Sequence, residues 1–332
     1  MAGALNGIEV HRPVLTSIPA RIAEKGWNFF FGNKPYLYKY GFEDRLAEER
    51  AFWTAVCHRA QILHVLYGDE QLDLLLRRAP FLPARLVATF HLPVTATRDR
   101  FERAQKEEIK RLSGAVVQSS CEVSELAHWL GAEKVIFIPH PVDIDAFTPR
   151  QISVHSTTAR FLFVGFHMRD FEVAHCVADQ CAFQGLDVIF DVVLPPDKLG
   201  FFEGCSNVRR HSDISESALI ALYQNADALF LPLIDATANN TVLEAMACGT
   251  PVISTRVGGV KDYVNEESGW LLPPRDTVAA FDCIRGLIEN RDLALDKGRG
   301  ARRQAELFSL ARIANELNIA YKRLLETGHF AA

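Results

Sequence analysis

The sequence predicts an α/β protein built from two doubly wound domains, each with a parallel sheet. Three observations support this fold class: short apolar segments without regular polar alternation, amphipathic segments between them, and a length of 332 residues. Strands buried on both faces of a parallel sheet have such uninterrupted apolar sequences. The length fits two domains of about 100–200 residues each.

The expected strands form two sets of four, and helical segments separate them. Residues 213 and 216, Asp and Glu, have the spacing of a capping box at the start of one helix. Alternation of strands and helices in both halves favours parallel sheets. The strands are expected at 62–67, 86–90, 115–118, 135–138, 161–164, 188–194, 228–231 and 252–254, and helices at 43–60, 122–130, 216–226 and 304–325.

We expect an N-terminal Rossmann-like domain over residues 1–150, a second one over 151–302 and a final helix over 303–332. The boundary is placed at 149–159, which lacks periodicity and follows a proline-containing turn. Only a weak strand pattern, at 8–10, precedes the first helix. The first strand–helix unit is therefore expected to be shortened or missing.

The composition excludes several classes of protein. Hydrophobic residues make up 48% and charged residues 23% of the chain, which is an ordinary globular composition. The net charge of −5 argues against a nucleic-acid partner. No apolar run approaches the roughly 18 residues of a membrane span, and no secretion signal is recognisable. The seven cysteines form no C-x-x-C pair, so we expect thiols in a reducing, cytoplasmic location.

One cluster of basic residues has two interpretations. It contains six cations interleaved with four acidic residues. A solvated helix with i,i+4 ion pairs accounts for this pattern. The alternative is a face that meets anionic lipid or an acidic acceptor, which would allow peripheral contact with the inner face of a membrane. The cations are Arg98, Arg100, Arg103, Lys106, Lys110 and Arg111.

Common cofactor signatures are absent from the sequence. It has no Walker A motif and no H-E-x-x-H, and its single G-x-G, Gly298-Arg299-Gly300, lies in a helical tract. Asp143 and Asp145 form a D-x-D that could hold a divalent metal. Such pairs are frequent by chance, and this one follows a turn out of a strand. We therefore expect no resident cofactor and no metal site.

The most informative block is 231–259. An expected strand ends near Leu233, a polar loop follows, and a short helix begins near Asn240 and stops before Gly249. A helix that opens just past the carboxyl end of a strand presents free N–H groups and a positive dipole end. Ligands of open α/β sheets bind at this edge. Phosphates would lie on the N–H groups of 239–241, and Glu244 could accept hydrogen bonds from two ribose hydroxyls.

This block resembles the retaining GT-B-fold glycosyltransferases of family 4, the glycosyl transferases of group 1. Residues 243–251, Leu-Glu-Ala-Met-Ala-Cys-Gly-Thr-Pro, match the family signature, and the passages at 138–149, 161–165 and 211–227 agree in order. Thr89-Phe90-His91 resembles a landmark of the first domain. The resemblance implies the GT-B fold, in which two Rossmann-like domains face a cleft and the last helix crosses back to the first domain.

The resemblance also implies the roles of individual residues. Arg169 should neutralise the leaving phosphate, and His91 should stand against the donor sugar. Eight residues before Glu244 the family has a glutamate, whereas this sequence has Ala236; Asp235 could take that role through a shifted loop or could merely cap the loop. The implied donor-binding residues are Gly165, His167, His211, Ile214, Asn239, Asn240, Thr241 and Glu244, with His211 to Ile214 as the base-binding loop.

The expected function is therefore retaining, metal-independent glycosyl transfer. The donor would be a nucleotide-sugar, UDP- or GDP-linked, and the acceptor a glycan, a lipid or a small molecule. The alternative is a catalytically impaired sugar-nucleotide-binding or assembly protein of the same fold. Ala236 and the abbreviated N-terminus motivate that alternative.

Overall fold

The computed structural model describes residues 42–96, 107–150 and 157–330. The chain divides into two compact units, which are described separately. Unit 1 comprises Met1–Ile138 and Asn315–Ala332, and unit 2 comprises Pro139–Ala314. The predictions for the N-terminal strand and for most of the basic cluster lie outside the described residues.

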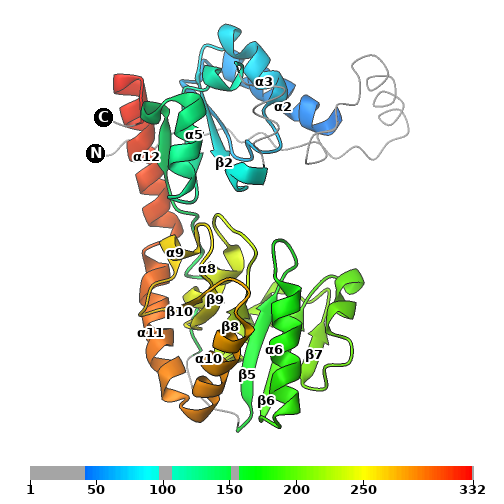
Figure 1. Cartoon of the computed structure of the whole chain (residues 1–332). Coiled ribbons are helices and arrows are strands. Elements are labelled where there is room, and N and C mark those ends of the chain that lie inside the picture. Colours follow the sequence, from blue (N-terminus) through cyan, green and yellow to red (C-terminus); the bar gives the residue numbers. More distant parts are fainter. Residues whose placement is uncertain (1–41, 97–106, 151–156, 331–332) are drawn as a thin grey trace. The chain divides into compact units, whose positions relative to one another are not determined.

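Unit 1 contains a four-stranded parallel sheet in the order β1-β2-β3-β4 (Figure 1). All four strands lie on the predicted apolar segments. The strands are β1 (Ile62–Val65), β2 (Arg85–Phe90), β3 (Gly114–Val117) and β4 (Val135–Phe137). The helices are α2 (Phe42–Cys57), α3 (Asp73–Arg78) and α5 (Glu122–Leu130), with short 3₁₀ turns at Ala79–Phe81, Ile109–Arg111 and Ala132–Lys134.

The end of the chain completes the core of unit 1. Leu324, in helix α12 (Leu310–Thr327), and Phe330 are buried, and the Phe330 ring occupies the space that a Cβ of Gly114 would need. The Tyr321 hydroxyl contacts Nδ1 of His64, and Nε2 of His64 lies 2.8 Å from Oγ1 of Thr89. One imidazole therefore joins β1, β2 and α12.

The buried His64 predicts an acid-sensitive unit 1. Burial, assisted by the nearby charge of His91, lowers the pKa of His64 to about 4, whereas in the unfolded chain it is about 6.5. Because the unfolded state takes up the proton first, stability falls as the pH drops from 6.5 toward 4. We expect His64 to account for a loss of about 2 kcal/mol in the free energy of unfolding between pH 7.5 and pH 5. Denaturant titrations at both pH values should show a smaller loss in His64→Gln than in the wild type; equal losses would contradict this assignment.

Unit 2 contains a six-stranded parallel sheet in the order β10-β9-β8-β5-β6-β7. Helices α6 and α10 pack together on one face, and α8 and α11 pack together on the other (Figure 1). The strands are β5 (Ala159–Val164), β6 (Val188–Val193), β7 (Val208–His211), β8 (Ala228–Leu231), β9 (Val252–Thr255) and β10 (Gly269–Leu272). The helices are α6 (Phe171–Phe183), α7 (Glu216–Asn225), α8 (Asn240–Ala247), α9 (Val260–Tyr263), α10 (Thr277–Glu289) and α11 (Asp292–Glu306), with a 3₁₀ segment at Pro196–Phe202.

The division into units falls earlier in the chain than the sequence suggested. Residues 139–150 belong to unit 2, where Val142 pairs with Ser309 in a parallel bridge. Nη1 of Arg302 also donates hydrogen bonds to this segment, among them one of 2.9 Å to the carbonyl oxygen of Phe147. These contacts hold the segment after β4 on unit 2, although it contains no regular element.

Two local predictions are corrected by the structure, and two strands were missed. The N-cap of α7 is Ser215, whose side chain accepts a hydrogen bond from the Ala218 N–H, so Asp213 forms no capping box. The helix expected at 304–325 is broken, because α11 ends at Glu306 and α12 begins at Leu310. The strands β7 and β10, at the two edges of the sheet of unit 2, were not predicted.

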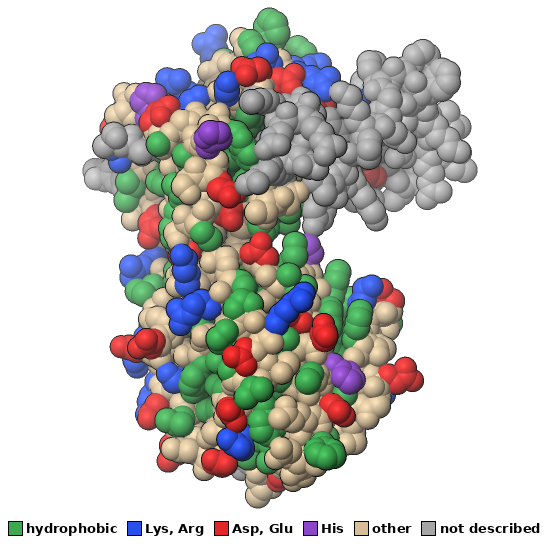
Figure 2. All heavy atoms as spheres, viewed as in Figure 1, with side chains coloured by type: hydrophobic (Ala, Val, Ile, Leu, Met, Phe, Trp, Pro, Cys, Tyr) green, Lys and Arg blue, Asp and Glu red, His purple; other side chains and the backbone are tan. Residues whose placement is uncertain are grey.

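The surface of the described residues mixes both signs of charge. On the face shown in Figure 2, basic and acidic side chains are interspersed among apolar and neutral ones. Among the described residues, no helix has both the length and the apolar character that crossing a membrane requires.

Candidate functional site

The start of α8 is the centre of the candidate site. Strand β8 ends at Leu231, an eight-residue loop follows, and Asn239 caps the helix by accepting a hydrogen bond from the Val242 N–H at 3.4 Å. The N–H groups of the first helical turn have no partner within the helix. The predicted helix start is thus confirmed, and Asn239, Asn240 and Thr241 all lie at it.

Arg169 lies against this helix start. It sits in the loop between β5 and α6 and pairs with Leu233 in an antiparallel bridge. Its Nε donates to the Val164 carbonyl at 3.1 Å, its Nη1 to the His167 carbonyl at 2.9 Å, and its Nη2 to Oγ1 of Thr241 at 3.3 Å. Burial lowers the pKa of Arg169 to about 10, so the guanidinium stays charged at neutral pH. Two residues that are 72 positions apart in sequence are therefore joined at the start of α8.

Gly165 makes room for this arginine. Its φ is +82°, a conformation that side chains rarely adopt, and a Cβ there would stand 3.0 Å from Nη2 of Arg169. We expect Gly165→Ala to lower the free energy of unfolding by about 1–2 kcal/mol and to weaken pyrophosphate binding by displacing the guanidinium. Thermal unfolding and calorimetry measure the two effects.

A helix glycine provides the matched control for this prediction. Gly286 lies inside α10 with nothing within 4 Å of the position of a Cβ. Gly286→Ala should be neutral or stabilising, by up to about 1 kcal/mol. Equal behaviour of the two variants would contradict the role given to Gly165.

Glu244 lies one turn into α8 and is half-buried. Its Oε2 accepts a hydrogen bond of 2.8 Å from the hydroxyl of Tyr223, a fully buried residue of α7. Burial raises the pKa of Glu244, and the Tyr223 hydrogen bond opposes that rise. Among the described residues no hydrogen bond to Oε1 is found.

The predicted base-binding residues begin at His211, the last residue of β7, and lie at the carboxyl ends of the strands. Nε2 of His211 lies 2.8 Å from Oδ1 of the buried Asp191 on β6, and Nη2 of Arg160 donates to the other oxygen of that carboxylate at 2.7 Å. The His211 side chain is thus engaged within the sheet, which leaves backbone groups up to the half-buried Ile214 for a base. His167 is exposed and contributes its carbonyl oxygen to Arg169.

Asp235 is held in the loop before α8. Its Oδ1 accepts a hydrogen bond of 2.8 Å from the Ala236 N–H, and the Ala236 carbonyl accepts one of 2.8 Å from the Gly259 N–H. Gly258 has a φ of +46°, and a Cβ there would clash with the Ala236 carbonyl. The hydrogen bond from the Ala236 N–H accounts for Asp235 as a residue that caps the loop. A catalytic role for Asp235 stays a prediction.

His91 belongs to unit 1, whereas the other predicted site residues belong to unit 2. It follows β2, its Nε2 contacts the Leu66 carbonyl at 2.7 Å, and its ring stacks on Tyr67 with centroids 4.9 Å apart. Burial lowers the pKa of His91, against the opposing hydrogen bonds to Leu66 and Gln118. The imidazole is therefore mainly neutral at neutral pH.

Asp143 has a structural role. Its Oδ1 accepts hydrogen bonds from the N–H groups of Asp145 at 3.0 Å and Ala146 at 2.9 Å, which closes a turn. Within the described ranges no group of three potential metal-ligating side chains is found.

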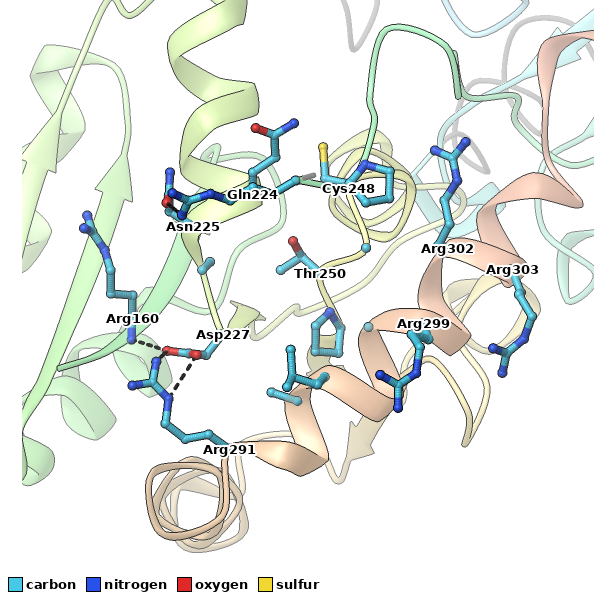
Figure 3. Close-up of a pocket in the computed structure, with 18 residues that line it drawn as sticks. Arg160, Gln224, Asn225, Asp227, Cys248, Thr250, Arg291, Arg299, Arg302 and Arg303 are labelled. Atoms are coloured by element: carbon cyan, nitrogen blue, oxygen red, sulfur yellow. Dashed lines mark hydrogen bonds and ion pairs between the residues drawn. The ribbon is translucent and has the colours of Figure 1, made fainter. Parts of the chain in front are cut away.

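A cavity of about 520 Å³ lies at the other end of the strands of the same sheet, where the strands begin (Figure 3). Arginines line it, but they are largely neutralised. Nη2 of Arg160 donates a hydrogen bond to Oδ2 of Asp191 at 2.7 Å, and Nε of Arg291 donates one to Oδ1 of Asp227 at 3.2 Å. Nη1 of Arg302 donates to the Ala247 carbonyl, at the carboxyl end of α8, at 2.8 Å. These arginines compensate carboxylates and helix ends, so the cavity does not compete with the site at the start of α8.

Tyr223 is the site residue that the sequence did not reveal. It lies in a passage that resembles the family, yet nothing local indicates that its hydroxyl contacts Glu244, 21 residues away. The hydroxyl of Thr241 was likewise not predicted, since only its backbone N–H was assigned.

Comparisons with known proteins find similarity to glycosyltransferases. The family model for glycosyl transferases group 1 matches residues 195–290. D-inositol 3-phosphate glycosyltransferase of Geodermatophilus obscurus is 28% identical over 239 residues, which are 64% of this chain and 52% of that protein. MMP alpha-(1->4)-mannosyltransferase of Mycolicibacterium hassiacum is 24% identical over 72% of this chain and 66% of that one. The chain thus spans about half the length of the first of these relatives.

Solved structures show the same fold. Sucrose-phosphate synthase of Thermosynechococcus elongatus aligns with a TM-score of 0.71 at 20% identity, over 86% of this chain and 78% of that one. HepE of Anabaena, solved with UDP and glucose, aligns with a TM-score of 0.68 at 16% identity, over 88% and 85% of the two chains. The chain therefore has a GT-B-type fold of two parallel-sheet α/β units, and its residues 195–290 match the glycosyl transferases of group 1.

Proposed function

We propose that this chain transfers a sugar from a nucleoside-diphosphate-sugar to an acceptor, with retention of the anomeric configuration. The observation that carries the proposal is the joining of Arg169 to the start of α8 through Thr241, with Glu244 one turn further along the helix. A fixed cation, free N–H groups and a helix dipole converge there, and this combination binds a diphosphate.

The donor would lie along the first turn of α8. The diphosphate oxygens would accept hydrogen bonds from the N–H groups of 239–241 and from Arg169, and Oε1 of Glu244 would accept hydrogen bonds from the ribose. The loop from His211 to Ile214 would contact the base through its backbone. UDP- and GDP-linked sugars are the donors that we propose.

The protein would act mainly on the leaving group. The bond between the anomeric carbon and the diphosphate oxygen breaks, and its electron pair goes to the diphosphate. The acceptor oxygen bonds to the same face of that carbon, and the acceptor proton passes to the leaving phosphate. Arg169 and the start of α8 stabilise the charge that develops, so we propose that no divalent metal is required. His91 and Asp235 are proposed to act near the donor sugar.

A panel of UDP- and GDP-sugars, tested for binding and for slow donor hydrolysis, examines this proposal. We expect one donor to bind and to be hydrolysed, and nuclear magnetic resonance of the released or transferred sugar should show a retained anomeric configuration. An inverted product would contradict the retaining mechanism. Donor binding with no hydrolysis and with no transfer to any glycan, lipid or small-molecule acceptor would instead indicate a binding or assembly protein.

The location that we propose is cytoplasmic; for the cluster at 98–111, contact with an anionic membrane surface is the alternative to a solvated helix with ion pairs. Sedimentation of the chain with vesicles of anionic or of neutral lipid tests that contact. Equal sedimentation with both would argue against an electrostatic contact.

A further inference from the structure

A buried tyrosine hydroxyl is directed at the candidate ribose ligand. Tyr223 is 0% exposed, and its ring packs edge-on against Phe147 with centroids 6.3 Å apart. A buried tyrosine hydroxyl needs a hydrogen-bond partner. Here the partner is Oε2 of Glu244, at 2.8 Å.

Thr241 belongs to the same group of residues. Its side chain interacts with that of Tyr223, and its Oγ1 accepts a hydrogen bond of 3.3 Å from Nη2 of Arg169. The Tyr223 hydroxyl therefore donates to Glu244 within the group of residues that forms the candidate site.

We propose that Tyr223 is a positioning residue for donor binding, which holds Oε2 of Glu244 so that Oε1 faces the ribose. This inference rests on the proposed function, since it assigns Glu244 to the ribose and Arg169 to the diphosphate. Tyr223 itself contacts no ligand in this arrangement.

The proposal predicts a pH-dependent effect that a purely structural tyrosine would not have. Glu244 must be ionised to accept hydrogen bonds from both ribose hydroxyls. Burial raises its pKa, Glu216 on α7 adds to that rise, and the Tyr223 hydrogen bond lowers it. Cys248, which directly follows α8, also faces Glu244. Burial raises the pKa of the Cys248 thiol to about 12, so the thiol stays neutral. Loss of the Tyr223 hydroxyl should therefore raise the pKa of Glu244 further and shift the acid loss of binding to higher pH.

The test is calorimetry of the full chain with UDP and with GDP from pH 5 to pH 8. For the diphosphate that the wild type binds, Tyr223→Phe should raise Kd about tenfold at neutral pH and move the acid limb upward. Tyr263→Phe is the matched control, because Tyr263 is also a buried tyrosine of unit 2, whose hydroxyl accepts a hydrogen bond of 3.0 Å from the His140 N–H. It should leave Kd and the pH profile unchanged.

Two further variants keep the test decisive. In a Glu244→Ala background, Tyr223→Phe should have no additional effect on Kd, because the tyrosine would act through the missing carboxylate. If Tyr223→Phe fails to fold, Glu244→Gln tests the same contact from the other side, because its amide cannot ionise and its Kd should lose the acid limb.

The outcomes separate this inference from the proposed function. A wild-type chain that binds no nucleoside diphosphate would overturn both. A wild type that binds, together with a Tyr223→Phe variant of unchanged Kd and pH profile, would overturn the positioning role alone. Additive effects of Tyr223→Phe and Glu244→Ala would overturn it as well.

Discussion

Replacing Arg169 with alanine should lower the turnover of the donor by about 10²–10³-fold, because the variant loses a fixed cation where phosphate charge develops. The guanidinium is preorganised by two carbonyl oxygens and by the Thr241 hydroxyl, so it need not reorganise during the reaction. A water molecule in the vacated space would supply no charge. Steady-state kinetics with the donor identified by the panel measures the effect.

Two variants control for charge and for folding. Arg285→Ala removes an exposed arginine of α10, whose ion pair with Asp282 contributes little, and it should turn over donor like the wild type. Arg169→Lys keeps the charge but cannot reproduce three divergent hydrogen bonds, so it should recover only part of the rate. Turnover by a folded Arg169→Ala variant at the wild-type rate would refute the assignment.

The inner strands of both sheets were predictable, and the two edge strands of unit 2 were not. A strand between two neighbours is buried on both faces and has an apolar sequence, as Phe161 to Val164 do. Strand β7, Val-Arg-Arg-His, lies at one edge and exposes its two arginines, so it shows no apolar run. Strand β10 begins with Gly269, which packs against the backbone of Val252, and a strand is not expected at glycine. The exposed arginines therefore hid β7 and the initial glycine hid β10, whereas the edge strands β1 and β4 of unit 1 are apolar and were predicted.

The residues at which helices begin and end were also hard to predict from the sequence alone. Asp213 and Ser215 are both good capping residues, and only the backbone decides between them. Asp213 has a φ of +52°, whereas Ser215 has the extended conformation of an N-cap. The interruption between α11 and α12, at 307–309, contains no glycine or proline, so the sequence there continued a helical pattern.

The candidate site was predictable where it depends on consecutive residues. The start of α8 and the position of Glu244 within its first turns follow from one block of sequence. The links from Arg169 to Thr241 and from Tyr223 to Glu244 depend on how separate elements pack, and no local pattern records them. The resemblance indicated Arg169, which lies in the loop between β5 and α6, but it did not indicate which groups orient its side chain.

Replacing Glu244 with alanine should raise Kd for the bound nucleoside diphosphate by about 10²–10³-fold, because two hydrogen bonds from the ribose to a carboxylate are lost together. The variant also leaves the Tyr223 hydroxyl buried without its acceptor, which should cost about 1–3 kcal/mol of stability. Glu244→Gln keeps an acceptor for Tyr223 and should retain most of the stability while still weakening nucleotide binding. Calorimetry and thermal unfolding of both variants separate the two effects.

Truncated ligands locate the lost contact. Pyrophosphate has no ribose, so the wild type and Glu244→Ala should bind it equally, whereas Arg169→Ala should bind it more weakly than either. A 2′,3′-dideoxynucleoside diphosphate lacks both ribose hydroxyls and should bind equally to the wild type and to Glu244→Ala. If Glu244→Ala instead weakened the binding of pyrophosphate as strongly as that of the complete nucleotide, the carboxylate would act on the organisation of the phosphate site, and its assignment to the ribose would be wrong.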